Sequence, residues 1–366
     1  MTPSFFLHGC NYPWSTDGTT VFYGLDFGAN IWGSHLGVST RRAAVAADFA
    51  AMARLGFTVA RWFVLCDGRS GIVYDKDGLP QGLDPFLLRD MDAALEIAAA
   101  AGIRLSLVML DHRWMFSGIA HHETDPVTGE RRRIPLPHGR ARVLLRKEGH
   151  DALFAAVLAP IVERYGPEGL RADLWPAIAA YELMNEPDFV VNEWTDLSRR
   201  VRRPLPFAVL ADLEARFSDL VHARSAAMTT LGGARVRNLD AWMDARLGID
   251  LLQVHSYPDA REPDRDVDLF GMPAAAFSPD RPLLLGEFPG DGPRQHPPGA
   301  TPPATTLDQY LEFAVAGGYA GAWPWSFSGT DPYGRLPAEP LLRFARAHPE
   351  LVNPRCFADG SSDFRW

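Results

Sequence analysis

The segment YELMNEPDF, Tyr181 to Phe189, runs from an apolar stretch into a carboxylate that is flanked by an amide and a proline. Residues 178–184 are apolar at nearly every position and not only at alternate positions. This pattern is typical of a parallel strand that is buried on both faces. A buried parallel strand that ends at Glu186 indicates an α/β fold with an ionisable group at the carboxyl end of the strand.

Seven further segments have the same character and are expected to be strands: residues 5–9, 58–65, 103–110, 227–231, 249–255, 282–287 and 321–325. Helical patterns lie between them, at residues 43–55, 85–101, 151–165, 207–226, 239–247, 307–317 and 341–348. This alternation predicts an α/β fold of the (β/α)₈ (TIM) barrel type, with residues 1–366 in a single domain. An open doubly wound sheet is the alternative, but Gly9-Cys10-Asn11-Tyr12 is not the glycine-rich phosphate turn of that fold.

Composition excludes several classes of function. The formal net charge of −9 offers no basic face for phosphates, so we expect no nucleic-acid partner. The three cysteines are odd in number and irregularly spaced, which favours a reducing compartment. Residues 1–12 lack the features of a signal peptide, and no window resembles a transmembrane helix. The sequence therefore predicts a cytoplasmic protein without a membrane partner, and leaves the oligomeric state open.

Polar and aromatic residues follow the expected strands, at the end where (β/α)₈ enzymes carry their active sites. Glu186 and Glu287 end the fourth and seventh strands, which lie on opposite sides of a barrel mouth. An unpaired carboxylate after an apolar run is costly unless it is neutral or hydrogen-bonded. Two facing carboxylates suit glycoside hydrolysis, in which one protonates the leaving oxygen and the other attacks the sugar. For either glutamate alone, a salt-bridged strand end would be the simpler interpretation.

Six short segments resemble glycoside hydrolase family five and its clan A relatives, the cellulase- and mannanase-like superfamily. ELMNEPD resembles the Asn-Glu-Pro signature, LLLGEFPG the segment of the nucleophile, and VHSYPD the His-x-Tyr of strand six. GYAGAWPWSF, ARWFV and HGCNY are similar to the final-strand tryptophan, the strand-two arginine and the first-strand turn. The matches keep the family order from Gly9 to Trp325, nearly the whole chain. The resemblance implies a retaining β-glycosidase on a (β/α)₈ barrel.

The resemblance also implies roles for individual polar residues. Glu186 matches the acid/base and Glu287 the nucleophile, while Asn185 matches the amide that binds the sugar 2-hydroxyl. In the family, two further positions donate to the nucleophile and one histidine lies near the acid/base. The matching residues are Arg61 and Tyr257 for the donors, and His255 for the histidine.

Other assignments from the resemblance are less specific. Trp325, and less readily Trp323, matches the floor of the −1 subsite, where an aromatic ring stacks on the sugar. We expect Trp323 to be a wall residue of the pocket. His112 follows the third strand, where relatives carry His or Asn, but Asp111 and a structural role for His112 are equal alternatives.

Two connecting segments, residues 11–38 and 113–149, are expected to be long loops over the carboxyl end of the barrel. Tryptophans in these loops and after the fourth strand are candidates for stacking on sugars, with packing under the loops as the alternative: Trp14, Trp114 and Trp194. Asp26 and Asp188 are candidates for binding sugar hydroxyls. His121-His122-Glu123 is not expected to bind metal, because adjacent histidines point in different directions. The sequence thus predicts neither a metal nor another cofactor.

The chain after Trp325 is too short for a carbohydrate-binding module. We therefore expect a retaining hydrolase that cleaves an oligosaccharide or small glycoside, gluco- or manno-configured, with its carboxylates about 5–5.5 Å apart. A transglycosidase that uses the same site is one alternative. A metal-dependent barrel hydrolase and a non-catalytic carbohydrate-binding barrel are alternatives from other classes. The sugar, the linkage and endo or exo action are left open.

Overall fold

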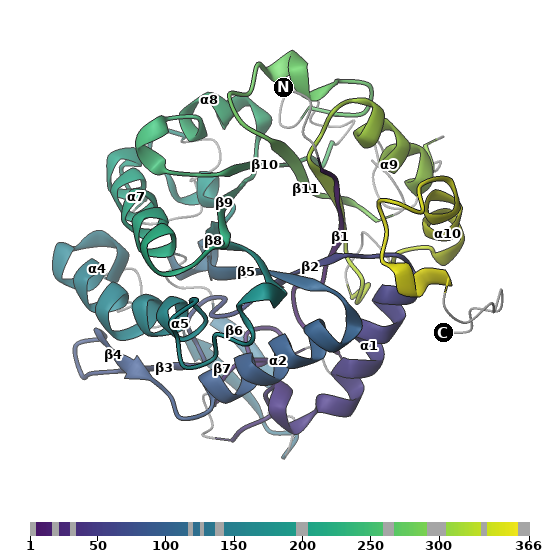
Figure 1. Ribbon diagram of the computed structural model, residues 1–366. Helices are drawn as coiled ribbons and strands as arrows, with labels where there is room; N and C mark the ends of the chain where they lie inside the picture. The colour runs from purple at the N-terminus through teal and green to yellow at the C-terminus, as the bar shows by residue number, and fades with distance from the viewer. Residues whose placement is uncertain are drawn as a thin grey trace.

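Eight parallel strands close into a barrel in the order β1-β12-β11-β10-β9-β8-β5-β2 (Figure 1). The computed structural model describes residues 5–16, 22–29, 34–115, 120–124, 128–135, 143–194, 204–258, 267–290, 305–330 and 335–357. The barrel strands are β1 Leu7–Asn11, β2 Val59–Phe63, β5 Arg104–Asp111, β8 Ile178–Asn185, β9 Met228–Gly233, β10 Leu251–His255, β11 Leu283–Pro289 and β12 Gly321–Trp325. Each overlaps one of the eight expected segments, so the predicted (β/α)₈ barrel is confirmed.

The helices form a ring outside the strands (Figure 1). They are α1 Arg42–Arg54, α2 Leu87–Ala101, α4 Lys147–Leu153, α5 Ala159–Arg164, α7 Phe207–Arg224, α8 Leu239–Trp242, α9 Leu307–Ala316 and α10 Ala338–Ala347. A π-helical segment, Phe154–Leu158, joins α4 to α5, so the helix expected at 151–165 is continuous but locally widened. The helix expected at 239–247 is shorter, because α8 gives way to a 3₁₀ turn. None of the described helices combines the length and apolar character needed to cross a bilayer.

The half of the barrel interior at the amino ends of the strands is an apolar layer. It contains Leu7, Val59, Ala179, Leu251, Leu284 and Trp323. The indole of Trp323 is fully buried and donates to the Leu7 carbonyl at 3.1 Å. Because inward positions recur every two residues along a strand, Trp323 and Trp325 point the same way, with Trp323 two residues deeper. The expectation that Trp323 forms a wall of the pocket is therefore wrong.

Two antiparallel hairpins extend the connections at the barrel mouth. One pairs β3 Ile72–Tyr74 with β4 Pro80–Leu83, and the other pairs β6 Ala120–Thr124 with β7 Arg131–Pro135. The second lies in the connection that was expected to be long, whereas the first was not expected. The side chains of His121, His122 and Glu123 lie outside the described residues.

Two aspartates proposed as sugar ligands are instead buried in the framework. Asp26 accepts hydrogen bonds from the Ser15 amide at 2.8 Å and the Trp62 indole at 3.0 Å. Asp188 accepts from the Ala234 amide at 2.7 Å. Each carboxylate is turned toward donors of the framework, which for Asp188 lie in the connection after β9, so neither is presented to a substrate.

Candidate active site

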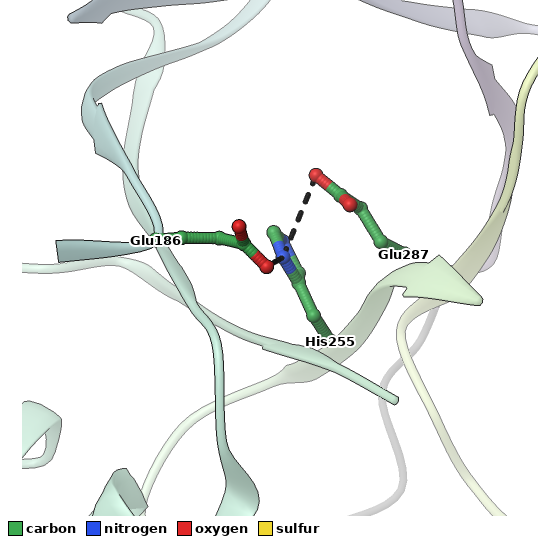
Figure 2. A group of neighbouring side chains, drawn as sticks. All are labelled: Glu186, His255 and Glu287. Carbon is green, nitrogen blue, oxygen red and sulfur yellow. Dashed lines mark hydrogen bonds and ion pairs between the residues drawn. The ribbon is translucent and has the colours of Figure 1, made fainter. Parts of the chain in front are cut away.

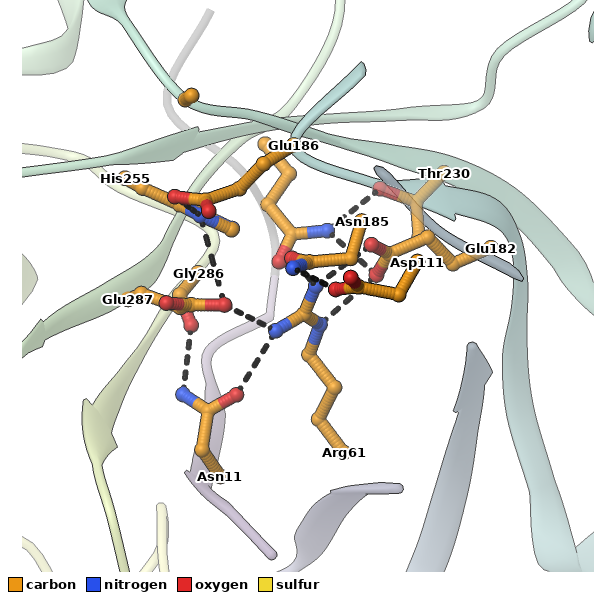
Figure 3. A network of polar contacts seen from close by, with 12 residues as sticks. Asn11, Arg61, Asp111, Glu182, Asn185, Glu186, Thr230, His255, Gly286 and Glu287 are labelled. Atoms are coloured by element: carbon orange, nitrogen blue, oxygen red, sulfur yellow. Dashed lines mark hydrogen bonds and ion pairs between the residues drawn. The ribbon is translucent and has the colours of Figure 1, made fainter. Parts of the chain in front are cut away.

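Polar side chains from six strands, β1, β2, β5, β8, β10 and β11, converge at the carboxyl end of the barrel (Figure 3). The described members are Asn11, Arg61, Asp111, Glu182, Asn185, Glu186, Gln253, His255, Tyr257 and Glu287. Their strands are parallel, so the side chains meet at one rim although they are far apart in sequence. The structure thus brings together all of the residues to which the resemblance assigned a polar role.

Arg61 on β2 is the centre of this network. Its guanidinium has five N–H groups and donates five hydrogen bonds. Two go to Glu182, from Nε at 2.8 Å and from Nη2 at 2.6 Å. The others reach Asn11 at 2.9 Å, Asn185 at 2.8 Å and Glu287 at 2.6 Å. Arg61 is fully buried, so this saturation offsets the cost of removing its charge from water.

Both oxygens of the Glu287 carboxylate accept hydrogen bonds. Oε1 accepts from Arg61 Nη1 at 2.6 Å, and Oε2 accepts from the Tyr257 hydroxyl at 2.9 Å. Burial raises the pKa of Glu287, and the charge and hydrogen bond of Arg61 oppose part of this rise. Glu287 is thus a buried carboxyl group whose ionised form is held by two donors.

Glu186 follows β8 in a left-handed backbone conformation, with φ of +49°. This conformation is costly for a residue with a side chain, by about 1–3 kcal/mol, and such residues cluster at functional sites. Its amide donates to the Gly232 carbonyl at 2.8 Å, which fixes the turn. The turn directs the carboxylate into the barrel mouth, where burial raises its pKa. The side chain of Glu186 is 15% exposed, against 5% for Glu287.

His255 lies between the two glutamates (Figure 2). Its Nδ1 is 3.2 Å from Glu186 Oε1 and 3.4 Å from Glu287 Oε1. Burial lowers the pKa of His255 to about 4, so the ring is neutral at pH 7. Its buried Nε2 has no hydrogen-bond partner among the described residues, so the ring proton belongs on Nδ1, where two acceptors lie.

Glu186, His255 and Glu287 each offer one atom that could bind a metal ion, and these three atoms lie within 4.8 Å of one another. Figure 2 shows the three side chains facing one another. This spacing alone would admit a cation. However, Arg61 already contacts Glu287, and a metal on His255 Nδ1 would place the ring proton on Nε2, away from any described acceptor. The chemistry of the three groups therefore favours proton transfer over metal binding.

Asp111 and His112, the two alternatives after the third strand, both lie beside the site. Asp111 accepts from Asn185 Nδ2 at 2.9 Å, so the Asn185 amide is fixed between Asp111 and Arg61. His112 Nδ1 is 3.8 Å from Glu186 Oε2 and 3.5 Å from Asp111. His112 is therefore a second imidazole beside Glu186.

The candidate tryptophans separate into two groups. Trp325 and the half-buried Trp14 lie together at the mouth, with ring centroids 5.9 Å apart, and Trp325 retains 9% exposure. Trp114 is only 2% exposed, because the 3₁₀ turn after β5 folds its ring against Gly68. Trp194 packs on Trp242 at 5.3 Å. The structure therefore places Trp114 in the core, so the expectation that it stacks on sugars is wrong, whereas Trp194 is half-buried and its contact with a sugar stays a prediction.

Sequence reasoning missed Glu182 and Gln253 in the barrel interior. Glu182 lies within a strand that is otherwise almost entirely apolar, and a carboxylate there requires a buried partner. That requirement was a usable signal, and the fully buried Arg61 meets it. Gln253 donates to Glu182 at 3.0 Å and gave no comparable signal, because a neutral amide in a strand is common.

Neither a protein-family model nor a curated protein matches the sequence. Solved structures are similar in fold: a β-1,4-D-mannanase from Cryptopygus antarcticus has 18% identity and a TM-score of 0.71, with 94% of this chain and 90% of that chain covered. A β-mannanase from the blue mussel Mytilus edulis has 19% identity, a TM-score of 0.69 and coverages of 94% and 91%. An endo-1,4-β-mannanase from Eisenia fetida has 18% identity, a TM-score of 0.68 and coverages of 93% and 91%. At these identities the likeness shows a shared (β/α)₈ fold.

Proposed function

We propose that this chain is a retaining β-glycoside hydrolase that cleaves β-mannosidic bonds. The observation that carries the proposal is the facing pair of carboxylates, Glu186 and Glu287, in which one oxygen of each lies within 4.8 Å of one oxygen of the other. Retaining glycosidases hold their carboxyl groups about 5–5.5 Å apart, and inverting ones about 6.5–9.5 Å apart to admit a water molecule. The short separation supports direct attack by a carboxylate on the sugar.

The different surroundings of the two glutamates support different roles. Glu287 accepts from Arg61 and Tyr257, and donors of this kind favour the ionised form that attacks as a nucleophile. Glu186 faces the imidazoles of His255 and His112 and is more exposed, which suits a group that exchanges protons with substrate and water. We therefore assign Glu287 as nucleophile and Glu186 as acid/base.

In the first step, an oxygen of Glu287 forms a bond to the anomeric carbon as the bond from that carbon to the glycosidic oxygen breaks. Glu186 gives its proton to the glycosidic oxygen, and the aglycone leaves as an alcohol. In the second step, the Glu186 carboxylate takes a proton from water. The hydroxide oxygen bonds to the anomeric carbon as the ester to Glu287 breaks. Two inversions give net retention, and replacing water by a sugar hydroxyl would give transglycosylation.

The mannosidic substrate is supported by the mannanases of similar fold and by the apolar rings at the mouth. The cluster of Trp325 with Phe63 and the half-buried Trp14, Tyr23 and Tyr257 offers faces for the C–H surface of a sugar. Asn185 and Asp111 supply polar contacts on the side of Glu186. A glucosidic substrate is the alternative, because glucose and mannose differ only in the configuration at C2.

The test is hydrolysis of aryl β-glycosides of mannose, glucose, galactose and xylose, and of β-1,4-linked mannooligosaccharides. The variants are Glu186→Ala and Glu287→Ala, assayed with and without azide, and Glu214→Gln is the matched control. Glu214 is a buried glutamate on α7, outside the barrel. We expect cleavage of mannosides by the wild type and by the control. Azide should yield the α-mannosyl azide with Glu287→Ala and the β-azide with Glu186→Ala.

Other outcomes would identify the alternatives. Binding of mannooligosaccharides without cleavage of any glycoside would support a carbohydrate-binding barrel. Loss of activity in a chelator, with recovery on adding metal, would support a metal-dependent hydrolase. Cleavage of glucosides in preference to mannosides would overturn the substrate but keep the mechanism.

A further inference from the structure

The buried carboxylate of Glu182 takes more of the hydrogen bonds of Arg61 than Glu287 does. Glu182 accepts two of the five, at 2.6 and 2.8 Å, whereas Glu287 accepts one. The two glutamates lie on opposite sides of the guanidinium (Figure 3). Glu182 is fully buried, and Gln253 also donates to it at 3.0 Å. Its contacts are thus with Arg61 and the barrel interior.

We propose that Glu182 is a positioning residue that acts through Arg61 to set the orientation and the charge state of Glu287. This inference rests on the proposed role of Glu287 as the nucleophile. Two physical effects support it, one geometric and one electrostatic.

The geometric effect comes from the paired hydrogen bonds. A carboxylate that accepts from both Nε and Nη2 fixes the plane of a guanidinium, because two parallel bonds allow little rotation. The plane of Arg61 in turn determines where Nη1 points, and Nη1 lies 2.6 Å from Glu287. Without Glu182, the guanidinium of Arg61 would be oriented only by its single hydrogen bonds to Asn11, Asn185 and Glu287.

The electrostatic effect comes from shared charge. One buried guanidinium faces two carboxylates, at 2.6 Å each. If Glu182 were neutral, the full positive charge of Arg61 would act on Glu287 and favour its ionised form more strongly. A carboxylate held in that way ionises at lower pH but is a weaker nucleophile. Glu182 therefore keeps the charge of Arg61 from over-stabilising the attacking group.

Gly232 on β9 lies against the contact between Glu182 and Arg61 and shows how closely it is packed. A Cβ at Gly232 would lie 2.5 Å from Glu182 Oε1 and 2.9 Å from Arg61 Nη2. Real Cβ contacts are longer than this, so any side chain at this position would displace the pair. The backbone of β9 thus leaves space for the Glu182–Arg61 contact and for little else.

The experiment compares Glu182→Gln, Glu182→Asp and the control Glu214→Gln in pH profiles of kcat and kcat/KM on an aryl β-mannoside. Glu182→Gln removes the charge, so the acid limb of kcat/KM should move to lower pH by about one unit, as expected for losing a nearby like charge. kcat should fall by about tenfold or more with less change in KM. Glu182→Asp keeps the charge but is too short for both bonds. The kcat of Glu182→Asp should fall, while the acid limb of its kcat/KM profile should stay at the pH of the wild type.

Glu214→Gln should leave both the acid limb and kcat unchanged. The proposal is overturned if folded Glu182→Gln and Glu182→Asp keep kcat within twofold of the wild type and do not move the limb. If Glu182→Gln does not fold, Glu182→Asp alone decides: a wild-type kcat rejects the proposal, and a reduced kcat with an unmoved limb supports it.

A readout without substrate separates this inference from the proposed function. Carbon-13 labelling of glutamate carboxyl groups allows NMR titration of Glu287, whose signal is identified by its loss in Glu287→Gln. The pKa of Glu287 should be lower in Glu182→Gln than in the wild type. An unchanged pKa would refute the charge effect even in an active enzyme. Conversely, a lowered pKa in a protein that cleaves no glycoside would refute the proposed function alone.

Discussion

At the scale of single residues, Glu186 and Glu287 share a side chain but differ in their partners. The oxygens of Glu287 meet a guanidinium and a phenol, at 2.6 and 2.9 Å. The carboxylate of Glu186 meets imidazole nitrogens, at 3.2 Å from His255 and 3.8 Å from His112. Burial raises the pKa of both, but the charge of Glu287 is held by a cationic donor, Arg61, whereas the donor nearest to Glu186 is the neutral ring of His255. In a retaining mechanism this difference separates the nucleophile from the acid/base.

The hydroxyl of Tyr257 provides a direct test of this assignment. Tyr257→Phe removes a hydrogen bond to the ionised form of Glu287, so the pKa of Glu287 should rise and the acid limb of kcat/KM should move to higher pH. kcat/KM at its optimum should fall between about tenfold and a hundredfold, since a hydrogen bond to a charged group contributes about 1.5–3 kcal/mol. The measurement is the pH profile of kcat/KM on an aryl β-mannoside.

Tyr181→Phe is the matched control. Tyr181 is a buried tyrosine on the barrel strand β8, and its hydroxyl has no hydrogen-bond partner among the described residues. The acid limb should not move in this variant. A limb that stays in place in Tyr257→Phe, or moves to lower pH, would contradict the assignment of Glu287 as the group that must be ionised.

At the scale of elements, buried carboxylates tie the connections to the barrel. Asp90 on α2 accepts from the amides of Gly28 and Ser39, each at 2.9 Å, and lies 2.9 Å from His35. Asp26 pairs with Arg41 at 2.7 Å in the same connection after β1. Ionised carboxylates satisfy several backbone donors at once, which suits a connection with few regular backbone bonds. The connection that carries Trp14 into the mouth is thereby held by charge-assisted hydrogen bonds.

Helix α7 contains a buried carboxyl group that lacks short hydrogen bonds to offset the cost of burial. Glu214 is fully buried, and its contact with the Ser218 hydroxyl is long, at 3.5 Å. Burial raises the pKa of Glu214 well above its usual value. In the unfolded chain this group loses its proton near pH 4.5, while the folded protein retains it to higher pH. The folded state therefore binds more protons above pH 4.5, and the free energy of unfolding falls as pH rises.

Glu214→Gln should remove this pH dependence. The free energy of unfolding of the wild type should decrease more between pH 4.5 and pH 8 than that of the variant, by about 1.4 kcal/mol for each unit by which the pKa is raised. Urea unfolding at both pH values measures the two differences. Glu163→Gln, at an exposed glutamate near the end of α5, is the control and should leave the pH dependence of the wild type intact. Equal decreases in wild type and Glu214→Gln would show that Glu214 is ionised in the folded state.

At the scale of the whole molecule, the barrel and most of the polar site were predictable from the sequence. Buried parallel strands leave long apolar runs, and their carboxyl ends must converge, so Glu186 and Glu287 could be placed opposite one another. The β3–β4 hairpin was missed because its strands have only three and four residues, although Ile72-Val73-Tyr74 followed by Asp77-Gly78 is typical of a hairpin. Trp323 and Trp325 have identical character in sequence, and their depth in the barrel depends on the register of β12 with its neighbours. Likewise, the core position of Trp114 follows from the fold of its loop.

Closure of the barrel predicts a further property of the whole molecule, its sensitivity to acid. His8 lies on β1, which joins β2 and β12 where the first and last strands meet. Its ring is fully buried against Phe57 and Phe344, with centroids 4.9 and 5.0 Å away. Burial lowers the pKa of His8 to about 3. The folded protein therefore keeps His8 neutral at pH values where the unfolded chain is protonated.

This difference gives the opposite sign to that of Glu214. Below pH 6.5 the unfolded chain binds a proton at His8 that the folded protein does not, so the free energy of unfolding should fall as pH decreases from about 6.5 toward 3. His8→Phe keeps an aromatic ring between Phe57 and Phe344 but cannot titrate. Thermal unfolding followed by circular dichroism between pH 7 and pH 4 should show a smaller decrease in Tm for His8→Phe than for the wild type.

The control for His8 is the half-exposed His222, which lies 2.8 Å from Asp250 on the outer surface. His222→Gln should retain the acid sensitivity of the wild type, because this ring lies on the outer surface and not in the seam between β1 and β12. If His8→Phe loses Tm with acid as steeply as the wild type, the proton uptake that opens the barrel belongs to other groups. If the loss is reduced only in His8→Phe, the seam between β1 and β12 is where protonation weakens closure.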